Sequence, residues 1–170
     1  ADELRQYGIE PDENMKKLTV YHVLTMTNGM ARHPIMDAEW LKNYLAEPVV
    51  AEPGTEFLYN SSGSCLLGAI VKKKTGKGMR EFLKEFLFDK IGIDGERFQI
   101  FRFPDGYDAE PGTASVTEDN LRLAILFMNY GNWNGEQIIA EDWMHMAMSC
   151  QISTEPNGGT EDYRHGYGFQ

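Results

Sequence analysis

Residues 53–68 constrain the fold of this chain more than any other stretch of its sequence. They open with a Pro-Gly pair, which marks a tight turn, and continue through a short extended run into apolar residues at helical spacing. Tyr59 therefore lies directly ahead of a helix, where a phenol can point into a cleft instead of a core. Ser61 or Ser62 is expected to cap that helix, because a serine hydroxyl accepts a hydrogen bond from an otherwise unpaired amide of the first turn.

A tyrosine at a loop-to-helix junction is most often a packing residue, but the residues around Tyr59 favour a functional role. The pattern P-G-T-x-F-x-Y-x-x-x-G-x-x-L-L-G resembles the second catalytic motif of the serine β-lactamase and penicillin-binding-protein superfamily, in its class C β-lactamase-related branch. The motif, Tyr-x-Asn in that branch, corresponds here to Tyr59, Asn60 and Ser61. Serine in place of the asparagine favours an esterase or amidase over a β-lactamase.

The resemblance extends over residues 2–170. Residues 18–30 are similar to the family's L-T-x-x-H-L-L-T-H-T-S-G-L segment, and residues 113–122 to its G-x-x-S-T-A-E-D-L-A-R segment. Residues 131–143 follow its G-x-W-N-G-x-x-I-L-x-x-E-W pattern, and residues 167–170 begin its Y-G-x-G-x-x-W strand. The resemblance implies a mostly α segment, the helical lobe of an α+β β-lactamase/DD-peptidase-like fold with a few short strands. Residues 1–170 are expected to form a single helical lobe of a larger serine hydrolase.

The family's nucleophile, the serine of Ser-x-x-Lys, has no counterpart here, because no serine of the sequence has a lysine three residues later. We expect that motif upstream of this chain and the sheet region with the third motif downstream. Residues 74–76 spell Lys-Thr-Gly, which is a third motif in many penicillin-recognising enzymes. We reject this match, because the triplet closes an amphipathic helix whose C-terminal cap is Gly76.

Hydrophobic spacing and capping residues predict the secondary structure. Thr19 is the expected N-cap of the first helix, and Asp37 and Thr117 are expected to cap later ones. His22 lies on the first of these helices and is interpreted as structural. We expect helices at residues 18–26, 37–46, 62–74, 79–88, 117–130 and 141–149, a strand at 98–103, a loop at 104–112 and a hairpin-like turn at 133–136.

The net charge of −10 argues against nucleic acid or an anionic membrane as a partner. No apolar run approaches the roughly 20 residues that cross a bilayer, and both the cytoplasm and the cell envelope remain open as locations. Cys65 and Cys150 are too few for a disulfide scaffold or a metal site, and Cys65 is expected in the core. We expect no cofactor and no metal.

In the complete family enzyme, the resemblance implies acyl transfer through an acyl-enzyme. A serine hydroxyl is a weak nucleophile unless a base takes its proton, and Tyr59 is the expected general base or acid. Ser61 is expected to line the cleft and to hydrogen-bond a substrate amide or the catalytic lysine, and Asn60 is the second candidate for contacting the substrate. The substrate would be a β-lactam, a D-amino-acid peptide, an ester or an amide.

The isolated chain is expected to be inactive and to self-associate through apolar surface that normally packs on the sheet. Two other hypotheses remain: a non-catalytic penicillin-binding-like scaffold or sensor, and a free-standing helical interaction domain.

Overall fold

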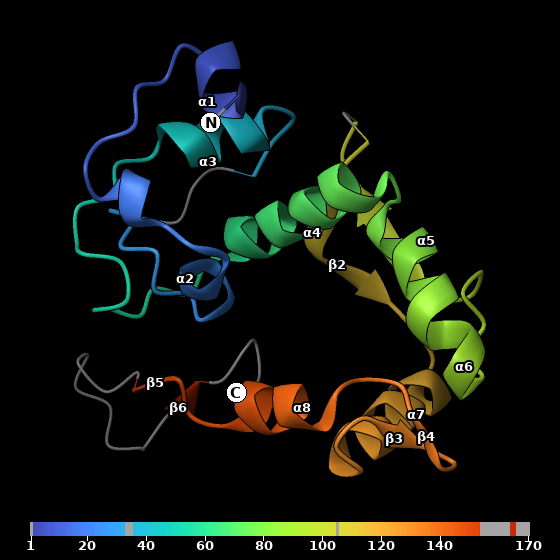
Figure 1. The fold of residues 1–170 in the computed structure, drawn as a ribbon. Helices are drawn as coiled ribbons and strands as arrows, with labels where there is room; N and C mark the ends of the chain where they lie inside the picture. The colour runs from blue at the N-terminus through green and yellow to red at the C-terminus, as the bar shows by residue number, and fades with distance from the viewer. Residues whose placement is uncertain (1, 33–35, 105, 154–163, 166–170) are drawn as a thin grey trace. The chain divides into compact units, whose positions relative to one another are not determined.

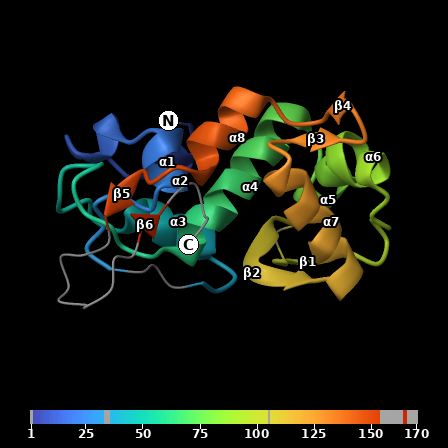
Figure 2. The same cartoon turned by 90° about the horizontal axis from the view of Figure 1, so that it is seen from below.

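The computed structural model describes residues 2–32, 36–104, 106–153 and 164–165 (Figure 1). The chain divides into two compact units, residues 1–67 with 150–170, and residues 68–149. Helices are the main regular secondary structure of both units, and the strands of the described residues form short two-stranded hairpins (Figure 2). The predicted fold class, mostly α with a few short strands, is confirmed. The single-lobe assignment stays a prediction. Residues 167–170, predicted as the start of a strand, lie outside the described residues.

The first unit is built from short helices around a small mixed core. α3 contributes the buried side chains of Trp40, Leu41 and Tyr44, and the other buried apolar residues come from α2, the segments that follow α2 and α3, and α4. Its elements are α1 (Asp2–Gln6), a 3₁₀ turn (Met15–Lys17), α2 (Val20–Leu24), α3 (Trp40–Ala46), the first turns of α4 (Ser61–Thr75), and the hairpin of β5 (Ile152–Ser153) with β6 (Arg164–His165).

Side-chain hydrogen bonds stabilise the backbone at the start of two helices of this unit, α2 and α3. Thr19 caps α2 as predicted, because its hydroxyl accepts from the backbone amide of His22 while Nδ1 of His22 accepts from the amide of Thr19. The predicted start of the next helix at Asp37 is three residues too early. The Asp37 carboxylate instead accepts from the amide of Glu39, 2.8 Å away, and stabilises the turn that precedes α3.

The apolar core of the second unit is formed by residues from the helical turns that end at residue 91, from the connection between these turns and strand β1, and from helix α7. Phe88, Ile91, Ile93, Phe98 and Leu126 make up this core, and the rings of Phe88 and Phe98 lie 4.7 Å apart. The elements are α5 (Met79–Leu83), a π-helical turn η2 (Lys84–Phe88), α6 (Asp89–Ile91), β1 (Gln99–Arg102), β2 (Asp108–Ala114), α7 (Thr117–Met128), β3 (Asn132–Trp133), β4 (Glu136–Gln137) and α8 (Glu141–Met148).

Two predictions for this unit are wrong. The stretch 104–112, expected to be a loop, contributes most of β2, which pairs with β1 in an antiparallel hairpin that is interrupted between Ile100 and Arg102. Thr117 is the first residue of α7 and not its cap; Val116 holds the N-cap position, and the amides of Asp119 and Asn120 reach its carbonyl oxygen. The predicted hairpin around residues 133–136 is confirmed by the pairing of β3 with β4.

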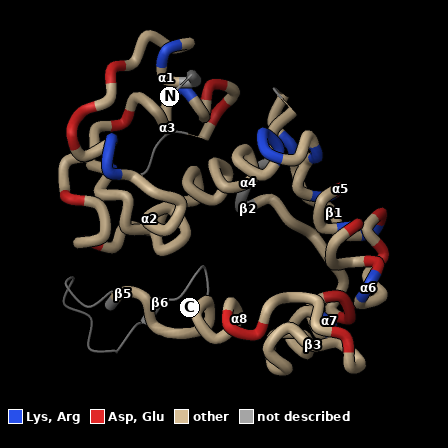
Figure 3. Tube along the Cα trace, in the orientation of Figure 1, with Lys and Arg blue, Asp and Glu red and all other residues tan. Residues whose placement is uncertain are grey.

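Charge is unevenly distributed along the chain (Figure 3). Three successive lysines, Lys72, Lys73 and Lys74, occupy the last turn of α4, where a cation is favoured by the negative end of the helix dipole. Among the described residues, no helix combines the length and the hydrophobicity needed to cross a membrane. Over the same ranges, no group of three or more His, Cys, Asp or Glu side chains is placed to hold a metal ion.

Candidate active site

Tyr59 is exposed, whereas the residues that directly follow it are buried. It ends the irregular segment that leads into α4, and 49% of its surface is accessible. The three residues that follow are buried, with exposed fractions of 1% for Asn60, 8% for Ser61 and 0% for Ser62. The chain on the C-terminal side of Tyr59 is therefore enclosed by protein, whereas Tyr59 itself is half exposed to solvent.

Asn60 is the N-cap of α4. Its side-chain Oδ1 accepts a hydrogen bond from the amide of Gly63, 3.0 Å away, and its backbone oxygen accepts from the same amide. The helix therefore begins at Ser61, and the prediction of a cap at Ser61 or Ser62 is wrong by one or two residues. Asparagine serves as well as serine here, because both offer a side-chain oxygen to the third amide of the helix.

The segment before Tyr59 is hydrogen-bonded to residues 26–30, which follow α2. The amide of Gly54 donates to the carbonyl of Thr27 at 2.8 Å, and the amide of Leu58 donates to the carbonyl of Met26 at 2.9 Å. The side-chain Nδ2 of Asn60 reaches the sulfur of Met30 at 3.4 Å. Residues 54–60 are thus held at both ends.

His22 is structural, as predicted. Besides its part in the capping box of α2, its ring packs beside Gly54, where an added β-carbon would lie 3.5 Å from Nε2. The imidazole therefore supports the turn that precedes Tyr59.

A buried polar cluster belongs to the same unit. Asn28 donates from Nδ2 to the hydroxyl of Tyr44 at 3.2 Å, and the hydroxyls of Thr25 and Thr27 lie 2.8 Å apart. Burial raises the pKa of Tyr44 to about 12, with the Asn28 hydrogen bond acting in the opposite direction. Tyr44 is therefore a neutral structural residue at any physiological pH.

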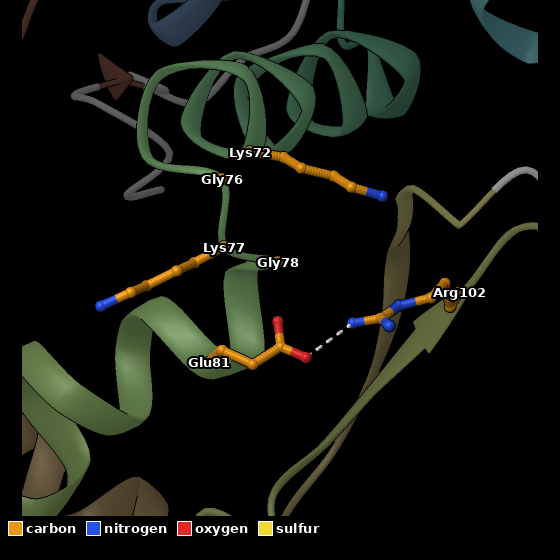
Figure 4. A pocket seen from close by; sticks show the side chains of 6 residues that line it. All are labelled: Lys72, Gly76, Lys77, Gly78, Glu81 and Arg102. Carbon is orange, nitrogen blue, oxygen red and sulfur yellow. Dashed lines mark hydrogen bonds and ion pairs between the residues drawn. The ribbon is translucent and has the colours of Figure 1, made fainter.

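A pocket of about 300 Å³ lies in the second unit, lined by Lys72, Gly76, Lys77, Gly78, Glu81 and Arg102 (Figure 4). The charges around it already serve the fold. Lys72 Nζ donates to the carbonyl of Gly106 at 2.6 Å, Arg102 pairs with Glu81 at 3.5 Å, and Lys77 pairs with Glu85. The pocket gives no separate functional assignment.

The end of α4 shows which structure the Lys-Thr-Gly triplet at residues 74–76 adopts. α4 ends at Thr75, and Gly76 has a positive φ of 74° with its amide donating to the carbonyl of Lys72. The triplet closes a helix and lies on no strand, so its rejection as a catalytic motif is confirmed. Cys65 is 1% exposed within α4, which confirms it as a core residue.

Solved structures of other proteins share the fold of this chain. The octameric penicillin-binding protein homologue from Pyrococcus abyssi superposes with a TM-score of 0.71 over 97% of this chain and 46% of that one, at 18% identity. A putative β-lactamase from Bacteroides dorei DSM 17855 gives a TM-score of 0.66 over 90% of this chain and 47% of its own, at 16% identity. The chain therefore has the fold of a segment of the serine β-lactamase and penicillin-binding-protein superfamily.

The sequence places the chain within one family of that superfamily. The profile of the Beta-lactamase family matches residues 2–170, and the chain belongs to this family. Monacolin J acid methylbutanoyltransferase from Aspergillus terreus is 29% identical over 108 residues, which cover 55% of this chain and 26% of that protein. The chain thus spans about a quarter of that relative and less than half of the two solved structures. The family is one of serine acyl hydrolases and transferases; the class C branch and the roles of Tyr59, Asn60 and Ser61 stay predictions.

Proposed function

We propose that this chain is the helical lobe of a larger serine acyl hydrolase or acyltransferase that works through an acyl-enzyme, and that Tyr59 is its general base and acid. The observation that carries the proposal is Tyr59 itself, exposed at the start of α4 in a chain whose family match covers residues 2–170. The coverage of its relatives, a quarter to a half of their length, supports a larger parent protein.

The nucleophile of the proposed reaction is a serine outside residues 1–170, since no serine here is followed by lysine at the third position. During acylation the serine oxygen forms a bond to the acyl carbon while its proton passes to the phenolate oxygen of Tyr59. Tyr59 then returns that proton to the leaving group as the bond between the leaving group and the acyl carbon breaks. In the second half, the acceptor loses a proton to Tyr59 as it attacks the acyl-enzyme, and that proton returns to the serine oxygen as it is released.

Ser61 is the proposed substrate contact on this chain. It follows Tyr59 by two residues and takes the position of the motif asparagine, where its hydroxyl can donate to an acyl or amide oxygen. Asn60 is less suited to that contact. Its side chain is 1% exposed and is engaged by Gly63 and Met30, which favours a structural role.

The proposed substrates share a carbonyl carbon that carries a nitrogen or oxygen leaving group. The names of the similar proteins include a β-lactamase, a penicillin-binding protein and a methylbutanoyltransferase, so a β-lactam, a D-amino-acid peptide, an ester or an amide each suits the proposal. Hydrolase and transferase differ only in whether water or an alcohol accepts the acyl group.

The test compares the full-length protein with the isolated chain of 170 residues. Each is incubated with a fluorescent penicillin and with a fluorophosphonate, and the adduct is located by mass spectrometry. We expect a single serine outside residues 1–170 to be labelled in the full-length protein, and no adduct on the isolated chain. Stoichiometric labelling of a serine within the chain would contradict the proposal. An unlabelled full-length protein would favour a non-catalytic scaffold.

A further inference from the structure

Tyr59 combines an exposed side chain with a firmly held backbone. On its N-terminal side the amide of Leu58 donates to the carbonyl of Met26 at 2.9 Å. On its C-terminal side Asn60 is 1% exposed and caps α4. A side chain that merely projects from a loop needs neither restraint.

Asn60 joins three separate parts of the first unit. Its Oδ1 accepts from the amide of Gly63 on α4 at 3.0 Å, and its Nδ2 donates to the sulfur of Met30 at 3.4 Å. Its backbone continues directly into Tyr59. One side chain therefore couples the start of the helix, the segment after α2 and the tyrosine.

The backbone of residues 26–30 presents carbonyl groups that accept hydrogen bonds from neighbouring segments. Met26 has a φ of 54°, in the left-handed region that non-glycine residues rarely adopt. Its carbonyl accepts from the amide of Leu58. Gly29 also has a positive φ, and its carbonyl accepts from the amides of Val50 and Ala51 at 2.8 and 3.1 Å.

We propose that Asn60 is a positioning residue for Tyr59, which fixes the phenol relative to α4 through the cap on Gly63 and the contact with Met30. This inference rests on the proposed role of Tyr59 in proton transfer. Proton transfer requires heavy atoms within hydrogen-bond reach, so a displacement of about 1 Å costs as much as a 100-fold loss of rate. Asn60 acts through the position of the tyrosine and touches no substrate.

The kinetic test uses the full-length protein and a chromogenic ester. We expect Asn60→Ala to lower kcat by about 10- to 100-fold and to leave KM within about twofold. Asn60→Ser should recover most of the rate, because a serine oxygen can cap the same amide. In a Tyr59→Phe background Asn60→Ala should have no further effect on kcat, since both changes act on the same group.

A matched control separates positioning from general destabilisation. Asp37→Ala removes a comparable side-chain acceptor, the one used by the amide of Glu39, at the start of another helix of the same unit. This variant should lower the melting temperature and keep kcat. In the full-length protein, Asn60→Ala should speed hydrogen exchange at the amides of Gly63 and Leu58 by at least about tenfold, and Asp37→Ala should not.

The outcomes are distinguishable. If Tyr59→Phe is slow while Asn60→Ala keeps the full rate, the positioning role alone is overturned. An unprotected Leu58 amide in the unmodified full-length protein has the same consequence. Full activity of Tyr59→Phe overturns both this inference and the proposed function. Loss of rate in Asp37→Ala equal to that in Asn60→Ala also overturns the positioning role, because both effects would then follow stability.

Discussion

The carboxylate of Asp119 is fully buried, and its Oδ1 lies 2.9 Å from Nη2 of Arg97. The second oxygen faces Nε of Arg97 at 3.4 Å, so the pair is bidentate. The hydrogen bond to Asp119 raises the pKa of the Arg97 guanidinium above its ordinary value. Arg97 itself is about half exposed. Loss of the partner should therefore destabilise the protein more when it leaves Asp119 unpaired than when it leaves Arg97 unpaired.

We expect Arg97→Met to lower the melting temperature more than Asp119→Asn does. The first change leaves a buried carboxylate without its cation, whereas the second leaves a guanidinium that water can reach. Thermal unfolding followed by circular dichroism measures both. Equal losses would show that Asp119 is solvated when the pair is broken.

The alkaline stability of the chain should depend on Tyr44. Its pKa of about 12 in the folded state exceeds the value near 10 of an exposed tyrosine. Ionisation of Tyr44 then leaves the free energy of unfolding unchanged below about pH 10. Between about pH 10 and 12 it lowers that free energy by roughly 3 kcal/mol in all. Urea unfolding from pH 8 to 12 measures this loss. Tyr44→Phe should remove the decline and cost about 1 kcal/mol at neutral pH, because the amide of Asn28 loses its acceptor.

Two glycines with nearly the same backbone conformation should respond differently to alanine. Gly76 has a φ of 74° with open space around it, so Gly76→Ala should cost about 1 to 2 kcal/mol. Gly29 has a φ of 70°, but a β-carbon there would collide with the carbonyl oxygen of Ala51. Crowding adds about 1 to 3 kcal/mol to the cost of Gly29→Ala. Chemical denaturation of both variants measures the loss in the free energy of unfolding. A similar loss in the two would show that the Ala51 carbonyl moves aside to accommodate the added β-carbon.

The isolated chain is expected to self-associate through α7. Leu121, Ile125 and Met128 recur at helical spacing, and Met128 is 75% exposed. Light scattering across a concentration series should show a rising mass, which the double change Leu121→Gln and Met128→Gln should suppress. Val50→Gln, at another exposed apolar position, is the control. A monomer at every concentration would contradict this prediction.

Local chemistry explains which parts of the fold were predictable. The cap at Thr19, the structural role of His22 and the helix end at Gly76 all depend chiefly on residues within four positions of one another. Because the main interaction in each case is between near neighbours in the sequence, these three features could be predicted and are confirmed. The N-cap of α4 was placed one or two residues too late, because Asn60, Ser61 and Ser62 are adjacent and each of these residue types can cap a helix.

Non-local pairing explains the strand that was missed. Residues 104–112 carry the Pro, Asp and Gly typical of a loop, yet β2 forms because Thr113 and Ala114 pair with Ile100 and Gln99 of β1. The support of Tyr59 by residues 26–30 was missed for the same reason, since backbone hydrogen bonds between distant segments leave no residue-type signal. The motif around Tyr59 predicted where to look, and only the structure shows what holds the backbone around the tyrosine in place.

The sharpest test of the proposed chemistry is Tyr59→Phe in the full-length protein. Phenylalanine keeps the ring and removes only the hydroxyl of a half-exposed side chain at the start of α4. If the phenol transfers protons, kcat/KM on a chromogenic ester should fall by about 100- to 10,000-fold, roughly 3 to 5 kcal/mol of barrier. The melting temperature should hardly change, because the hydroxyl of a half-exposed tyrosine contributes little to packing.

A structural hydroxyl gives the opposite pattern. Its loss would cost about 0.5 to 1.5 kcal/mol of stability and leave turnover nearly intact. Tyr21→Phe is the matched control, since Tyr21 is a similarly exposed tyrosine of the same unit whose hydroxyl bonds to Gln151. Measured together, the kinetics and the melting temperatures of the two variants decide between the roles. Normal kinetics with a lowered melting temperature in Tyr59→Phe would reduce Tyr59 to a packing residue, and the catalytic assignment would fall with it.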